Sequence, residues 1–209
     1  MEIVWLGHSC FRLKGKEAVI VTDPYEGLKA DSLLADIVTV SHEHPGHSFL
    51  TAMKDEPKVL RGPGEYEIRG AFIYGFRTFH DNVRGRARGK NIIFLIQADG
   101  VKVCHLGDLG HVLSAEQVEE LSDTDVLLVP MGGDSTIGAA EAAEVVNLID
   151  PKLVIPMHFQ SQKGKPNSAP LSKFLQEMGL RVASPLPKLA VTKTNLPAET
   201  QVVVLEPSQ

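Results

Sequence analysis

"SHEHPGHS", residues 41–48, places three histidines within six positions and directly follows the apolar run "ADIVTV", residues 35–40. The apolar run predicts a buried strand, so His42, His44 and His47 lie at the carboxyl end of that strand. On an extended chain, residues two apart point to the same side, and a tight turn returns His47 toward the same cleft. Because divalent metals such as zinc bind imidazole nitrogens, the stretch predicts a metal site.

Three further candidate ligands stand where other apolar runs end, namely His80, Asp108 and His158. Strand ends are where folds of mixed helix and strand expose functional side chains. Each residue also has a structural alternative. His80 fits an ordinary loop histidine, Asp108 fits a turn residue beside glycine, and His158 fits a core histidine.

The hydrophobic pattern predicts strands in the first half of the chain and alternating helices and strands in the second. Strands are expected over 2–6, 10–15, 17–23, 35–40, 57–60, 71–76, 91–97, 101–106, 125–130, 152–159, 189–194 and 201–207. Helices are expected over 114–121, 139–149 and 171–179, and a turn-rich connector over 61–70. No linker interrupts the pattern, which favours one domain over residues 1–209 with helices outside its sheets.

The composition is that of an ordinary globular protein of 209 residues with a net charge of −5. This charge argues against a nucleic-acid partner, and no apolar run is long enough to predict a membrane span. The two cysteines, Cys10 and Cys104, form no paired motif and are expected to be reduced core residues. We therefore expect a cytoplasmic protein that acts on a small molecule. Whether the protein forms a homo-oligomer stays open.

Several motifs in order along the chain resemble those of one known family. They are "WLGHSCF" (5–11), "TDPY" (22–25), "HEHPGH" (42–47) and "GPGEYEI" (62–68), followed by the isolated His80, "GD" and a final histidine. In this order the motifs resemble the metallo-β-lactamase superfamily, and in particular its small hydrolases related to ascorbate-6-phosphate lactonase. The resemblance implies an α/β fold, a four-layer αβ/βα sandwich with metals between the two sheets at one edge.

The resemblance also implies a ligand set. A first metal would be held by His42, His44 and His80, with Asp108 bridging to a second metal on His47 and His158. In the family pattern an aspartate precedes the last histidine of the motif, whereas this chain has Gly46 there. Losing that carboxylate leads us to expect one tight site and a weaker second one. Zinc is the favoured metal, with manganese or iron as alternatives.

Other residues are candidates for supporting roles. The family pattern suggests that Asp23 supports the metal histidines from behind. Asp23, Glu65, His8 and His111 are candidates to take over the positioning role of the missing carboxylate. Three arginines of the segment "RGRARGK" are candidates for binding an anionic substrate, the alternative being a solvated loop, and they are Arg84, Arg86 and Arg88.

We therefore expect a metal-dependent hydrolase of a small, anionic ester, lactone or phosphoester. A metal-bound hydroxide would attack the substrate, and Asp108 and His158 would be the catalytic protein groups. Gly46 supports one alternative, a member of the fold that binds metal or ligand without catalysis. A nuclease is a third hypothesis, against which the acidic charge balance argues.

Overall fold

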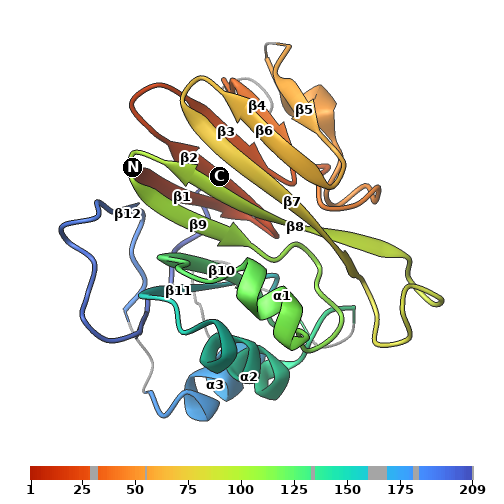
Figure 1. Cartoon of the computed structure of the whole chain (residues 1–209), viewed down its shortest axis with the longest axis vertical. Coiled ribbons are helices and arrows are strands. Elements are labelled where there is room, and N and C mark those ends of the chain that lie inside the picture. The colour runs from red at the N-terminus through yellow and green to blue at the C-terminus, as the bar shows by residue number, and fades with distance from the viewer. Residues whose placement is uncertain (29–32, 55, 133–134, 160–168, 181–183, 209) are drawn as a thin grey trace.

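The structure is a computed structural model that describes residues 1–28, 33–54, 56–132, 135–159, 169–180 and 184–208. Two mixed β-sheets face one another (Figure 1). The first sheet contains, in spatial order, β12 (Leu189–Ala190), β1 (Glu2–Gly7), β2 (Cys10–Lys14), β3 (Val19–Thr22), β4 (Ile37–Thr39) and β5 (Lys58–Leu60). None of the described helices is long and apolar enough to cross a membrane.

The second sheet contains β13 (Gln201–Val202), β11 (Leu153–Met157), β10 (Val126–Pro130), β9 (Val101–His105), β8 (Lys90–Ala98), β7 (Ala71–Phe79) and β6 (Gly64–Ile68), in spatial order. The helices α1 (Ala115–Glu120), α2 (Ala139–Ile149) and α3 (Ala169–Glu177) gather on the β10–β11 side of this sheet (Figure 1). The short 3₁₀ helix η2 (Leu50–Ala52) follows the first sheet's strand β4. These features confirm the predicted fold class.

The core lies between the sheets because the strands alternate their apolar side chains between two faces. On β1, Ile3 and Trp5 belong to the large core cluster with Phe94 of β8, whereas Val4 and Leu6 belong to a smaller cluster. Trp5 is buried, and its ring centroid lies 5.1 Å from that of Phe159, at the end of β11. The two sheets therefore pack against one another at the end where β1 and β11 finish.

The C-terminal part of the chain adds one strand to each sheet: β12 pairs with β1, and β13 pairs with β11. The expected strands over 189–194 and 201–207 thus shorten to two residues each. The turn-rich connector expected over 61–70 is wrong in part, because β6 forms within it and pairs with β7. The assignment of residues 1–209 to a single domain stays a prediction.

Candidate metal centre

The predicted site residues follow strands that run in the same direction within each sheet. In the first sheet β1, β3 and β4 run alike, and His8, Asp23 and the 41–48 loop follow them. In the second sheet β7, β9 and β11 run alike. They are followed by His80, Asp108 and His158 respectively. Because both sheets present their carboxyl ends at the same edge, residues 150 positions apart meet there.

One carboxylate oxygen, Oδ2 of Asp108, is the centre of this cluster. Four imidazole Nε2 atoms lie near it, those of His47 at 3.2 Å, His158 at 3.3 Å, His80 at 3.4 Å and His42 at 3.9 Å. Asp108, His42, His47 and His80 are buried, whereas His44 is exposed. The arrangement is that of a carboxylate shared between two sets of imidazole ligands.

The potential ligand atoms fall into groups that each lie within 4.8 Å of one another. One group is His42, His44 and His80, which is the first-site set that the family resemblance implies. A second group is His8, His47 and His158. The structure therefore brings all six expected ligands together and adds His8 to them.

Asp23 supports both sets from behind the histidines. The backbone N–H of Ser41 donates to Oδ1 of Asp23 (2.7 Å), and the Ser41 hydroxyl donates to Oδ2 (2.5 Å). His47 donates from Nδ1 to the same Oδ2 (2.9 Å), and His42 Nδ1 lies 2.9 Å from Ser41 Oγ. These bonds place protons on Nδ1 of both rings, so that Nε2 is the ring atom that each histidine directs at Asp108.

The surroundings of the two supported histidines set their protonation in opposite ways. Desolvation, with the nearby His47, lowers the pKa of His42 to about 3, so this ring is neutral and has a lone pair for a metal. Desolvation would also lower the pKa of His47, but hydrogen bonds to Asp108 and Asp23 outweigh it and raise that pKa to about 9. A metal at His47 would therefore replace a proton.

The donor set fits a divalent metal. The Nε2 of His42 is buried and has no hydrogen-bond partner among the described residues. A buried polar atom without a partner is costly unless something else pairs with it, and a cation next to a carboxylate does so. Imidazoles with one carboxylate suit zinc, manganese and iron alike.

The sequence reasoning missed Asn91, which positions the central carboxylate. Asn91 is buried on β8, and its Oδ1 accepts from the backbone N–H of Asp108 (2.9 Å). Its Nδ2 donates to Thr78 Oγ1 (2.8 Å) and to the carbonyl of Leu106 (2.9 Å). An asparagine inside an apolar strand was the available signal, because a buried amide must find partners.

Two other candidates have no described hydrogen bond or ion pair to the ligands of the cluster. Glu65 is exposed on β6, and no described hydrogen bond or ion pair joins it to the histidines. His111 has a structural role, since its Nε2 accepts from the backbone N–H of Phe79 (3.3 Å) and its Nδ1 donates to the carbonyl of Val112 (2.8 Å).

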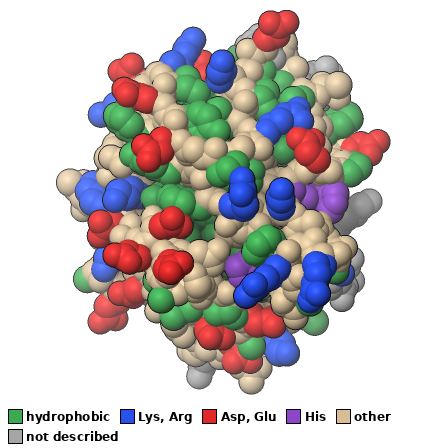
Figure 2. Space-filling model, turned by 45° about the vertical axis from the view of Figure 1, so that its right-hand side comes forward, with side chains coloured by type: hydrophobic (Ala, Val, Ile, Leu, Met, Phe, Trp, Pro, Cys, Tyr) green, Lys and Arg blue, Asp and Glu red, His purple; other side chains and the backbone are tan. Residues whose placement is uncertain are grey.

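The three arginines lie in a loop organised by Asp81. The carboxylate of Asp81 accepts from the backbone N–H groups of Val83 (2.9 Å), Gly85 (2.7 Å), Ala87 (2.9 Å) and Arg88 (2.7 Å). Arg84, Arg86 and Arg88 are exposed. Arg88 lines a cavity of about 480 Å³ together with His80 and His111, so it is the arginine that shares a cavity with a candidate ligand. On the face shown in Figure 2, histidine side chains reach the surface beside lysine and arginine side chains.

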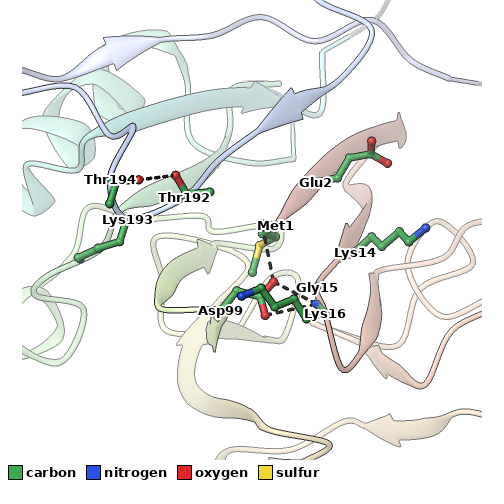
Figure 3. Close-up of a pocket in the computed structure, with 9 residues that line it drawn as sticks. All are labelled: Met1, Glu2, Lys14, Gly15, Lys16, Asp99, Thr192, Lys193 and Thr194. Atoms are coloured by element: carbon green, nitrogen blue, oxygen red, sulfur yellow. Dashed lines mark hydrogen bonds and ion pairs between the residues drawn. The ribbon is translucent and has the colours of Figure 1, made fainter.

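A second cavity, of about 530 Å³, lies at the other end of β1 and is unrelated to the cluster. Asp99 sits between Met1 and Lys16 in it (Figure 3). Its carboxylate accepts from the backbone N–H of Lys16 (3.1 Å) and pairs with the terminal ammonium of Met1 (3.7 Å). These charges already have partners, so the cavity offers no metal site.

Comparison with known proteins identifies the family. The model of the beta-lactamase superfamily domain matches residues 2–158. A UPF0173 metal-dependent hydrolase of Thermoplasma acidophilum is 30% identical over 189 residues, covering 77% of this chain and 84% of the relative. One from Thermococcus onnurineus is 28% identical over 191 residues, covering 77% and 85%.

A solved structure from Thermotoga maritima, described as a proposed Zn-dependent hydrolase of the metallo-beta-lactamase superfamily, is also similar. It is 41% identical, with a TM-score of 0.80 over 98% of this chain and 97% of that one. The chain therefore belongs to the metallo-β-lactamase superfamily, among its metal-dependent hydrolases.

Proposed function

We propose that this protein hydrolyses a small anionic ester, lactone or phosphoester, with a divalent metal on His42, His44, His80 and Asp108. The observation that carries the proposal is the convergence of four imidazole Nε2 atoms on one oxygen of Asp108, at 3.2 to 3.9 Å. Such a donor set at an edge with one exposed histidine leaves room for a substrate beside the metal.

Zinc is the metal that we propose. The donor set supports it, and the similar protein from Thermotoga maritima is described as Zn-dependent. When bound, zinc polarises the scissile oxygen and lowers the pKa of a water to about 7, which makes a nucleophile available at neutral pH.

The chain's own groups orient and insulate this chemistry. Asp23 and Ser41 keep the Nδ1 protons on His47 and His42, so that their Nε2 atoms stay directed at the site. Asn91 holds the backbone beside Asp108. We propose Asp108 and His158, whose Nε2 lies 3.3 Å from Asp108 Oδ2, as the groups nearest the reacting atoms.

Arg88 supports the preference for an anion. Its exposed guanidinium lines the cavity of about 480 Å³ that His80 also lines, and a guanidinium can bind carboxylate or phosphate through two parallel hydrogen bonds. The proposed partner is accordingly a small molecule. The net charge of −5 supports the absence of a nucleic-acid partner.

The test is a substrate panel on protein loaded with zinc, manganese or iron. The panel pairs esters and lactones that carry a phosphate or carboxylate with neutral analogues, and it includes phosphodiesters. We expect kcat/KM to favour the anionic members and Arg88→Ala to raise KM for them by about 10-fold, the equivalent of one charge-assisted hydrogen bond.

Arg69→Ala is the matched control, because Arg69 is an exposed arginine paired with Asp36 (2.9 Å) outside the cavity. It should leave KM unchanged. Turnover no faster than that of free metal across the whole panel would contradict the proposed function.

A further inference from the structure

Gly46 stands where the family resemblance implies a metal-binding aspartate, and the structure places another side chain beside that position. A Cβ built on Gly46 would lie 3.4 Å from Nε2 and 3.5 Å from Cε1 of His8. No positive φ is recorded for Gly46, so its backbone would accept a side chain. The space beside position 46 is therefore shared with the imidazole of a residue 38 positions earlier in the chain.

The backbone of His8 is fixed at this place. His8 follows β1 and has φ of 52°, a left-handed conformation that is strained for a residue with a Cβ. Its carbonyl accepts from Trp5 Nε1 (3.0 Å) and from the backbone N–H of His158 (3.2 Å). His158, with φ of 56°, is strained in the same way. Two adjoining strained histidines tied by a backbone hydrogen bond indicate a site that the surrounding fold maintains.

The ring of His8 lies against the rings of the two second-site histidines. Its centroid is 4.3 Å from that of His158 and 4.7 Å from that of His47, at interplanar angles of 80° and 83°. Ligand atoms of the three residues lie within 4.8 Å of one another. The Nδ1 of His8 is buried without a hydrogen-bond partner among the described residues. Three imidazoles thus surround one point beside Asp108.

We propose that His8 replaces the carboxylate absent at Gly46 and completes a second metal site with His47, His158 and the shared Asp108. The inference rests on the proposed function for its first site. The second site is then not weakened by the loss of the aspartate, because its third imidazole comes from the turn after β1 and not from the 41–48 loop. Three imidazoles with one carboxylate are a sufficient set for a divalent metal.

The replacement also changes the charge of the centre. Two divalent cations carry +4, and Asp108 as the only carboxylate ligand leaves +3, whereas an aspartate at position 46 would leave +2. The additional positive charge attracts an anionic substrate more strongly in the low-dielectric site. The second site is thereby linked to the preference for anions.

Metal counting tests the inference without reference to activity. Apo protein is titrated with zinc by isothermal calorimetry, and the metal retained after dialysis is measured by mass spectrometry. We expect two zinc ions per chain in the wild type. His8→Ala should retain one, with the affinity of the second site reduced at least about 100-fold. Removing a ligand should reduce metal affinity more than removing a residue that only hydrogen-bonds to a ligand.

The decisive variant is His8→Ala/Gly46→Asp, which moves the third ligand back to position 46. We expect it to regain the second zinc ion. His44→Ala is the matched control, since it removes an exposed histidine of the other group and should weaken the first site alone. If His8→Ala fails to fold, His8→Gly relieves the left-handed strain and removes the same ligand.

Two zinc ions in His8→Ala with wild-type affinity would overturn the inference. So would a single zinc ion in the wild type, although the proposed function on the first site would then stand. A wild type that binds no zinc, manganese or iron would overturn both. The double variant could also fail to regain the second zinc ion while Gly46→Asp alone binds two. That result would show that an aspartate at position 46 binds metal only together with His8, and it would overturn the inference that His8 replaces the aspartate.

Discussion

Asp23 is fully buried, and it orients two of the candidate ligands, His47 directly and His42 through Ser41. Its buried carboxylate is ionised, because hydrogen bonds from His47 and Ser41 and the charge of His105 lower its pKa against the opposing effect of burial. We expect Asp23→Asn to weaken zinc binding by about 10–100-fold, the usual effect of removing the partner that orients a ligating histidine. Calorimetric titration with zinc measures this directly.

Asp125→Asn is the matched control for that variant. Asp125 is also a buried aspartate, and it accepts from Lys193 Nζ (2.8 Å) and from the backbone N–H of Lys102 (2.9 Å), away from the histidines. The control should lose stability and keep its zinc affinity. Equal zinc affinity in Asp23→Asn and the wild type would show that Asp23 does not orient the metal ligands.

Individual ligands could be predicted from the sequence because each stands at the end of an apolar run. The ligand role that we propose for His8 and the positioning role of Asn91 could not. The neighbour of Gly46 depends on how the turn after β1 packs against the loop after β4, and no spacing along the chain encodes that contact. Likewise, Asn91 acts on Asp108 across paired strands.

The β8–β9 hairpin turns through Asp99 and Gly100, whose φ values of 54° and 77° fit the two-residue turn that the sequence "ADG" predicts. A Cβ on Gly100 would meet nothing within 4 Å, so only backbone strain opposes a side chain there. We expect Gly100→Ala to destabilise the fold by about 1 kcal/mol. Urea unfolding of apo protein measures the change, and an unchanged zinc affinity confirms that the effect is confined to the hairpin.

The 81–89 loop depends on one ionised carboxylate. Desolvation raises the pKa of Asp81, but backbone N–H donors of Arg88, Gly85, Val83 and Ala87 outweigh it and lower the pKa from 3.8 to about 2. Because the carboxyl pKa is lower in the folded loop than in the unfolded chain, the ionised carboxylate stabilises the fold at pH values above 3.8. This contribution disappears as the pH falls through about 2. Asp81→Asn should remove it at every pH.

Amide hydrogen exchange tests this loop. In the wild type, protection of the four donor amides should be complete above pH 4 and should fall as the pH approaches 2. Asp81→Asn should show weaker protection that does not vary with acid over this range. Equal protection in both proteins would show that the loop is held by other contacts.

Elements with a strong local pattern were predictable, and those that depend on a partner were not. The helix over 139–149 is confirmed as α2. The helix from Ser114 is confirmed as α1, with a capping box in which the Ser114 hydroxyl accepts from the backbone N–H of Gln117 and the Gln117 side chain accepts from the backbone N–H of Ser114. The strand β6 was missed because glycines and charges dominate "GPGEYEI", and pairing with β7 decides its conformation. The C-terminal runs have strand-like composition, but only two residues of each find a partner strand.

At the scale of the whole molecule, the site joins the two sheets. His42 and His47 come from the first sheet, and His80, Asp108 and His158 from the second. A metal bound across this boundary stabilises the native state by mass action, by about 2.7 kcal/mol when free metal is at 100 times its Kd. We expect zinc to raise the midpoint of thermal unfolding and a chelator to reverse the rise.

Asp108→Asn provides the control for this measurement, because it removes the carboxylate that all four Nε2 atoms approach. Its midpoint should respond little to zinc. A wild-type midpoint that is insensitive to both zinc and chelator would contradict a metal held between the sheets.

The distance along the chain from His8 to His158 also has a consequence for the timing of assembly. The three histidines of the 41–48 loop are neighbours from the start, whereas Asp108 and His158 arrive after the second sheet has formed, since long loops close slowly. Metal present during refolding therefore meets partial ligand sets first, and we expect it to delay the native state relative to metal added afterwards. Equal refolding rates for the two orders of addition would contradict this. The moment at which metal reaches the chain thus governs how fast the native protein forms.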